Sequence, residues 1–227
     1  MGFFKVDTSE ENVKDYSGGD GKYITKSGMY EVILKAVWVD STPNGSEHIN
    51  LLIEYNGQEQ PLFQAMRLTN NDGSKNLGQG LFTKLCVVCG ATDGAEVSDP
   101  ITRNLPVGEK GAEKECSVLA DFDNQPVILR IQMEYGIYQG NIQQRKNVRN
   151  IFRVPDKATA SEILNSPKEE YGQQYEKELE FAENITYKDD VTEEDVKAWI
   201  KNRKSGKKEA GDKKPAGGFG GKKFGKK

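Results

Sequence analysis

The segment 134–154 interleaves cationic and aromatic side chains in a pattern that suits single-stranded nucleic acid. It reads EYGIYQGNIQQRKNVRNIFRV and has no carboxylate between Glu134 and Asp156. Guanidinium and ammonium groups can follow phosphates while flat rings stack on bases, at about 1–3 kcal/mol per stacked base, and neither contact needs a particular base sequence. The alternative is an ordinary polar strand face whose cations protect a sheet edge. The candidates for binding in this segment are Tyr135, Tyr138, Arg145, Lys146, Arg149 and Arg153.

Further candidates lie on the expected polar faces of other strands. Lys35 is on the polar face of the first strand, Phe63 and Arg67 share a face of the third, and Arg130 opposes the apolar residues of the fourth. We predict that the arginines and lysines contact phosphates and that Tyr135, Tyr138 and Phe63 stack on bases. On the last strand, Arg149 and Arg153 are expected on one solvent-facing side.

Two other chemistries are possible on residue type. Cys86 and Cys89 have a Cys-x-x-Cys spacing, and Cys116 with His48 would complete a tetrahedral zinc set. The simpler interpretation is that these are buried thiols, because the pair lies within one apolar helical stripe and has no second Cys-x-x-Cys. A nuclease would need several loop aspartates to converge on Mg²⁺. Those aspartates are Asp72, Asp93, Asp99, Asp121 and Asp123.

Composition narrows the class of protein. The chain has 227 residues, 35% of them apolar, three cysteines and one histidine. Three cysteines in a chain this long argue against a disulfide scaffold and for a reducing compartment. The sequence also lacks both a run of about 18 apolar residues and an apolar leader. We therefore expect a protein of the cytoplasm that neither spans a membrane nor is secreted, and that binds no cofactor.

Charge is strongly segregated along the chain. Residues 1–161 carry 17 basic and 21 acidic side chains, residues 162–196 carry 3 and 12, and residues 197–227 carry 12 and 2. An acidic block of −9 thus precedes a basic end of +10, and such blocks are usually interaction segments. The Lys- and Gly-rich stretch 204–227 cannot bury enough apolar surface to offset its chain entropy, so we predict that it is disordered.

The body alternates polar and apolar residues as half-buried strands do. Strands are expected at 30–39, 48–55 and 61–68, with a tight turn at Asn56-Gly57. A change to helical spacing predicts one helix from Leu77 to about Gly90, and 91–115 is expected to be a long connection. Two more strands, 127–135 and 147–154, follow. Three strands, a helix and two strands give the order of a five-stranded antiparallel oligonucleotide-binding (OB) barrel with one helix between strands 3 and 4.

The acidic block is expected to be helical. Ser166-Pro167 with Glu169 resembles the start of a helix that runs towards Glu183. A second helix is expected from Thr192, with Val196, Trp199 and Ile200 forming one apolar stripe that docks on the body. The predicted organisation is an OB domain over 1–157, an acidic helical extension over 158–203 and a disordered basic tail over 204–227.

Several stretches together resemble the bacteriophage single-stranded-DNA-binding proteins with an OB fold. They are MGFFKVDTSE, VWVD, INLLIEYNGQEQPLFQAMRLTNNDG, LFTKLCVVCGA and NVRNIFRV, and the likeness covers roughly residues 1–155. The resemblance implies sequence-tolerant coating of single strands during DNA replication or recombination, without catalysis or bound metal, and with replication or recombination proteins as partners. Oligomers are possible. The basic end departs from the family, in which many chains finish in an acidic tail.

The predicted function is therefore sequence-tolerant binding of single-stranded DNA. Two roles remain open for the basic tail: it binds phosphates directly, or it pairs with the acidic block when DNA is absent. Two other functions also remain open. One is a phage structural or assembly protein with a nucleic-acid-binding tail, and the other is a metal-dependent nuclease.

Overall fold

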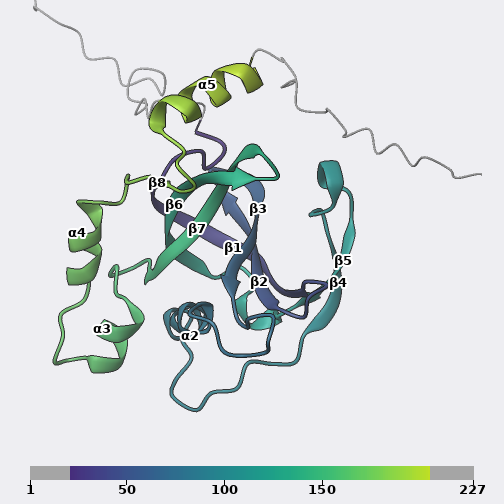
Figure 1. The fold of residues 1–227 in the computed structure, drawn as a ribbon. Helices are drawn as coiled ribbons and strands as arrows, with labels where there is room; N and C mark the ends of the chain where they lie inside the picture. The colour runs from purple at the N-terminus through teal and green to yellow at the C-terminus, as the bar shows by residue number, and fades with distance from the viewer. Residues whose placement is uncertain (1–20, 205–227) are drawn as a thin grey trace, which may run out of the picture.

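The computed structural model describes residues 21–204, which form a strongly curved, mainly antiparallel β-sheet with helices around it (Figure 1). The sheet order is β3-β2-β1-β5-β4, and β6 joins it by pairing with β1, β7 and β8. Only the pair of β6 with β8 is parallel. The strands are β1 (Gly28–Ser41), β2 (Glu47–Tyr55), β3 (Gln58–Arg67), β4 (Ile101–Leu105), β5 (Lys114–Val118), β6 (Pro126–Tyr138), β7 (Asn141–Arg153) and β8 (Thr186–Tyr187).

Strand β1 links the two halves of the sheet. Its first half pairs with β6 and its second half with β2 and β5. A bulge between Leu34 and Ala36 exchanges the faces of the strand, so that Leu34 and Ala36 point into different hydrophobic clusters. Unbroken alternation over the predicted strand 30–39 would have placed both residues on one face, so the bulge overturns that pattern.

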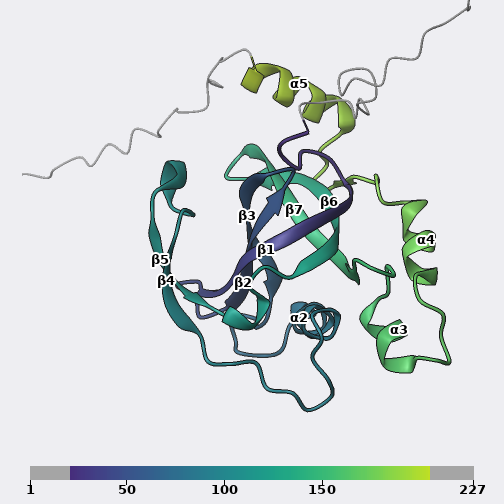
Figure 2. The same cartoon turned by 180° about the vertical axis from the view of Figure 1, so that it is seen from behind.

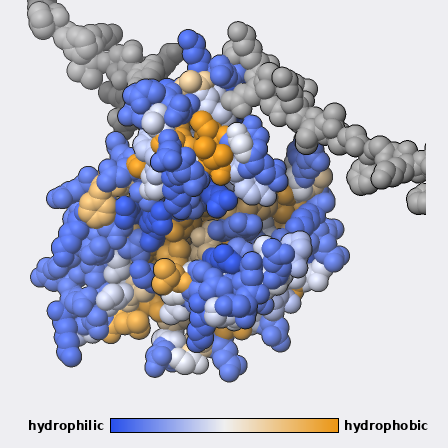
Figure 3. All heavy atoms as spheres, in the orientation of Figure 1, coloured by the Kyte–Doolittle hydropathy of each residue, from blue (hydrophilic) through white to orange (hydrophobic). Residues whose placement is uncertain are grey.

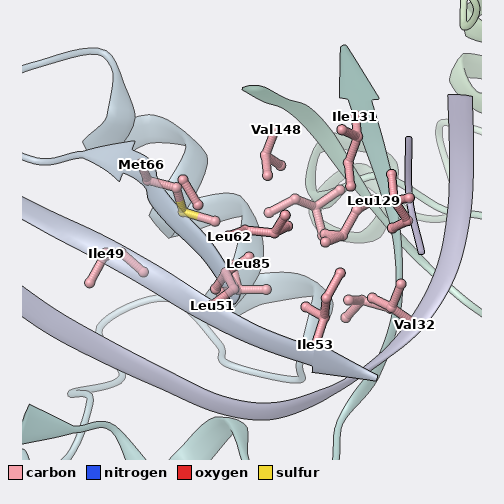
Figure 4. Close-up of a cluster of buried hydrophobic side chains, with 14 of the residues drawn as sticks. Val32, Ile49, Leu51, Ile53, Leu62, Met66, Leu85, Leu129, Ile131 and Val148 are labelled. Carbon is pink, nitrogen blue, oxygen red and sulfur yellow. The ribbon is translucent and has the colours of Figure 1, made fainter. Parts of the chain in front are cut away.

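The first hydrophobic cluster fills the concave side of the sheet. Figure 4 shows its side chains from β1, β2, β3, β6 and β7 pointing toward one another, with Leu85 of helix α2 (Gly78–Val88) closing one side. The predicted helix is thus confirmed, within two residues at each end. The labelled members are Val32, Ile49, Leu51, Ile53, Leu62, Met66, Leu85, Leu129, Ile131 and Val148.

A hairpin that the sequence did not predict covers part of the convex side. Strands β4 and β5 pair antiparallel over residues 101–105 and 114–118. Most of these residues lie in the stretch 91–115, which we expected to be a connection. The hairpin buries Trp38, which is 1% exposed, in a second hydrophobic cluster. Figures 1 and 2 show the hairpin on the opposite side of the sheet from α3 and α4. This cluster comprises Ala36, Trp38, Leu52, Leu105, Val107, Cys116 and Val118.

The mainly antiparallel β architecture is confirmed, but the count of five strands is wrong, since residues 21–204 alone contain eight. Strands β3 and β7 lie next to each other, yet within the described residues no backbone ladder joins them. The sheet is open at this seam. One side-chain bond spans it, from Lys146 Nζ to Gln60 Oε1 at 3.3 Å.

The last two strands are longer than predicted. Strands β6 and β7 form one continuous ribbon, joined at Gln139 and Gly140, which both have positive φ. This is the backbone that a two-residue hairpin turn requires. The predicted loop before residue 147 is therefore part of β7, and Arg145 and Lys146 lie on a strand.

The acidic extension begins with a different helix from the predicted one. Helix α3 (Ala160–Asn165) starts at Thr159, whose side chain forms a reciprocal capping box with Glu162. Ser166 follows the end of this helix in an extended conformation, so its predicted role as a helix start is wrong. The predicted long helix is replaced by the short helix α4 (Gln173–Leu179).

Helix α5 (Glu193–Lys204) confirms the predicted last helix. Thr192 and Asp195 cap its start, Val196 is buried, and the Trp199 ring meets the Tyr135 ring edge-on. The predicted disordered tail lies outside the described residues, except for Lys204, which ends α5. Within residues 21–204, no helix is both long and apolar enough to cross a membrane.

Candidate nucleic-acid interface

A groove of about 600 Å³ lies where the C-terminal end of β3, the start of α2 and the middle of β7 meet, along the open seam of the sheet. We call it the basic groove. Five cations line it, and among the described residues Glu134 is its one carboxylate. The cations are Arg67, Lys84, Arg145, Arg149 and Lys188. The remaining lining residues are Ala65, Met66, Asn76, Leu77, Gly78, Gly80, Leu81, Asn147 and Val148.

One wall of the basic groove depends on a close approach between the start of α2 and the end of β3. Asn76 N donates to Leu68 O at 2.9 Å, and a side chain on Gly78 would collide with the backbone of Arg67. Only glycine fits at position 78 without a shift of the wall. Arg67 is held beside it, because Nε donates to Thr69 O at 3.0 Å and Nη2 to Asn71 Oδ1 at 2.9 Å.

The other wall is the β6–β7 ribbon. Glu134 pairs with Arg145 in the register, and Gln132 pairs with Asn147, so that Arg145 and Asn147 lie on the outer side of the ribbon. A bulge at Arg149 keeps this arginine exposed between Val148 and Asn150, which are both buried. Arg149 Nε donates to Gln132 Oε1 at 2.7 Å.

The cations of the basic groove are only partly neutralised. Glu134 has a side chain that is 7% exposed, and Lys188 Nζ lies 2.8 Å from it, with Arg149 at 3.8 Å. Arg67, Lys84 and Arg145 form no ion pair within the described residues. Uncompensated positive charge in a recess attracts an anionic ligand.

The structure brings three of the predicted site residues into the basic groove, namely Arg67, Arg145 and Arg149. The sequence-based prediction missed Lys84 and Lys188. Lys84 lies beside the apolar stripe of α2 and could have been found from helical spacing. Lys188 follows β8, whose parallel pairing with β6 has no local signal in the sequence.

Two predicted phosphate contacts, Arg130 and Arg153, lie under the acidic extension. Arg130 Nη1 is 3.0 Å from Glu178 Oε2, and its guanidinium lies 4.7 Å from the centre of the Phe181 ring. Arg153 pairs with Asp156 and covers the Tyr171 ring, and the hydrogen bond from Arg153 lowers the pKa of Asp156. The prediction that Arg149 and Arg153 share an open face is wrong, because of the bulge and of this cover.

Two more predicted contacts are engaged elsewhere. Lys146 points to the inner side of the seam, where burial lowers the pKa of its ammonium group. Lys35 lies at the β1 bulge, 3.6 Å from Glu54 Oε2. Neither residue lines the basic groove.

The three predicted base-stacking rings are not gathered in one place. Tyr135 is 4% exposed, stacked against Tyr187 and edge-on to Trp199. Phe63 is 53% exposed but meets the Trp38 ring at the second hydrophobic cluster. Tyr138 is 52% exposed and lies on the same outer side of the ribbon as Glu134. It follows Glu134 by four residues, which separates their Cα atoms by about 13 Å along the strand.

A second recess, of about 470 Å³, has the opposite character. It lies between α3, α4 and β7 and carries four glutamates against two lysines. Lys84 and Asn150 line it on the side nearest the basic groove, and Lys84 Nζ is 3.4 Å from Asn150 Oδ1. Because carboxylates dominate this recess, it repels phosphates. The glutamates are Glu162, Glu169, Glu170 and Glu178.

The alternative metal sites are not assembled in the described part of the chain. Cys116 lies in the second hydrophobic cluster, whereas Cys86 and Cys89 pack against the first. Burial raises the pKa of Cys89 to about 12, which keeps its thiol protonated. Between residues 21 and 204, no group of three or more His, Cys, Asp or Glu side chains could hold a metal ion.

Of these two recesses, the basic groove is thus the one whose charge suits an anion. Comparison with protein-family models and with curated proteins finds no match for this chain, so we infer function from the groove itself.

Proposed function

We propose that this chain binds single-stranded DNA in a sequence-tolerant way through the basic groove, and that it coats single strands in DNA replication or recombination. The observation that carries the proposal is the convergence of five cations from β3, α2, β7 and the segment after β8. These four segments are far apart in the sequence, and the fold places them around one recess. No catalytic step is part of the proposal. In this proposal the curved sheet carries the binding groove, as the sheet of an OB fold does.

The shape of the basic groove favours a single strand over a duplex. It is a recess between the edges of two strands and the start of a helix, with cations on both walls. A flexible strand can lower its backbone into such a recess and meet both walls. A duplex holds its phosphates on a stiff outer surface and reaches only the rim. Charged grooves that follow the backbone are typical of proteins that bind single strands without sequence preference.

The test is a fluorescence anisotropy titration of the full chain with labelled oligo-dT, a mixed-sequence single strand and a matched duplex. We expect the two single strands to bind with similar affinity and the duplex more weakly. A protein that uses this surface for assembly would show no such preference. Equal binding of duplex and single strand, or binding of one sequence alone, would contradict the proposal.

The double variant Arg145→Gln/Arg149→Gln assigns the binding to the groove. Its matched control is Lys110→Gln/Lys201→Gln, which removes two exposed cations on the β4–β5 hairpin and on α5. We expect the groove variant to weaken single-strand binding on every sequence alike and the control to leave it nearly unchanged. Equal losses in the two variants would assign binding to net charge and not to the groove.

A further inference from the structure

The lining of the basic groove offers hydrogen-bond donors and almost no acceptors. Arginine and lysine side chains only donate. Glu134 already accepts from Lys188 at 2.8 Å. The Asn76 side chain is already hydrogen-bonded within the protein, since its Nδ2 donates to Asn70 Oδ1 and its Oδ1 accepts from Gly78 N. Asn147 is the remaining amide in the lining. Phosphate oxygens only accept, whereas base edges present donors and acceptors together. The groove therefore matches phosphates and not base edges.

The basic groove also lacks a platform for stacking. Within residues 21–204, no aromatic side chain lines it. The rings of the extension are occupied, because Arg130 lies over Phe181, Arg153 over Tyr171 and Lys157 over Tyr175. Tyr135 is sealed between Tyr187 and Trp199. Figure 3 shows that the surface on one face is mostly hydrophilic, with its apolar residues in small separate groups.

The cations lie on both walls of the groove, and those of Arg149 and Lys188 lie beside the same Glu134 carboxylate. Arg145 and Arg149 lie four residues apart on β7, which places their Cα atoms up to about 13 Å apart. Arg67 and Lys84 face them from β3 and α2 across the groove. A compact anion would meet only some of these groups, whereas a chain of phosphates can meet them in succession.

We propose that the basic groove recognises the chain of phosphates alone and leaves the bases in solvent. Its ligand class is a flexible polymer of closely spaced phosphates, of which single-stranded nucleic acid and inorganic polyphosphate are two sources. This inference deepens the proposed function and rests on the same groove. It replaces base stacking, which was expected from the sequence, by contact with the backbone.

The test is a competition measurement on the full chain, with labelled oligo-dT as the probe. The competitors are unlabelled oligo-dT, an abasic oligodeoxynucleotide of the same length, and inorganic polyphosphate with a similar number of phosphates. We expect the abasic strand to compete within about threefold of oligo-dT, because binding through phosphates alone loses no contact when the bases are removed. If bases stacked on the protein, each lost stacking contact would weaken binding by about tenfold. Polyphosphate is expected to displace the probe as well. An abasic strand that competes more than about tenfold more weakly overturns the inference and leaves the proposed function standing.

Variants separate the remaining outcomes. Tyr138→Ala removes the one exposed ring on the outer side of the ribbon, and we expect it to leave the ratio of abasic to oligo-dT affinity unchanged. Loss of oligo-dT affinity in this variant, with abasic affinity unchanged, would overturn the inference. Direct titration with labelled polyphosphate is then compared between the wild-type chain, Arg145→Gln/Arg149→Gln and Lys110→Gln/Lys201→Gln. Groove-dependent binding of polyphosphate without binding of oligo-dT would support the inference and reject the proposed function. Absence of groove-dependent binding for both ligands would reject both.

Discussion

The salt dependence of binding gives a quantitative test of the basic groove. The groove has five cations and one carboxylate, which leaves a net charge of four. Binding to single strands weakens with a slope of about −0.7 in log–log form for each phosphate neutralised. If each net charge neutralises one phosphate, the groove contributes a slope of about −2.8, equal to a loss of about 50-fold in affinity between 50 and 200 mM salt. Removing Arg145 and Arg149 halves this slope to about −1.4, or about sevenfold over the same range.

The assay is anisotropy of labelled oligo-dT at four or more salt concentrations, for the wild-type chain and for Arg145→Gln/Arg149→Gln. Any contribution of the lysines of residues 205–227 to the measured slopes is common to both proteins. The difference between the two slopes, about 1.4, is therefore the quantity to compare. Lys110→Gln/Lys201→Gln, with the same loss of charge away from the groove, should keep the wild-type slope. An unchanged slope in the groove variant would refute the assignment of phosphate contacts to Arg145 and Arg149.

Three further predictions concern stability and the walls of the groove. Gly78→Ala should lower the free energy of unfolding by about 2 kcal/mol and weaken oligo-dT binding, because the new Cβ collides with the Arg67 backbone. Gly80→Ala, at an open helical position, should instead stabilise by about 1 kcal/mol, and equal effects in urea unfolding would contradict this account. Glu178→Ala should lower stability by about 3 kcal/mol, because Arg130 loses its buried partner, while Glu180→Ala, at an exposed position, should change stability little. Equal thermal unfolding of the two variants would argue against a stabilising role for the Arg130–Glu178 ion pair. Burial lowers the pKa of His48 in the folded chain below its usual 6.5, so as the pH falls below 6.5 the unfolded chain binds a proton on His48 before the folded chain does, and stability declines. His48→Gln should therefore make the urea midpoint depend less on pH between about pH 7 and pH 5.5. An unaltered pH profile in this variant would contradict the account.

Local signals in the sequence were sufficient for several elements. Alternation located β1, β2 and β3, and the Asn56-Gly57 turn has the two positive φ values that its residue types predict. Spacing of three and four residues located α2 and α5. These features depend on contacts between neighbours in the chain, which a single sequence displays directly.

Features that depend on distant contacts could not be predicted in this way. The bulge at Lys35 changes the faces of β1 without any mark in the alternation, and the five-residue strands β4 and β5 are stable only because they pair and cover Trp38. The start of α3 is different, because the capping box of Thr159 with Glu162 is a local signal that was present in the sequence and was missed in favour of Ser166.

The candidate site was predicted in part for the same reason. The cations of β7 were found because they stand close together in the sequence, and Arg67 was found from strand alternation. Burial of Arg130 by Glu178 and of Tyr135 by Trp199 involves residues 48 and 64 positions away, respectively, and required the three-dimensional arrangement. Residue type identified positive charge and rings correctly, but not which of them the fold would leave open.

Hydrogen exchange of the full chain with and without saturating oligo-dT tests the central claim most directly, because it locates the bound strand on the fold. We expect protection at three of the segments that line the groove, 64–68, 76–84 and 145–149, and no change in the β4–β5 hairpin at 101–118. Protection confined to that hairpin, or to the acidic recess beside α3 and α4, would contradict the assignment of the basic groove as the binding site.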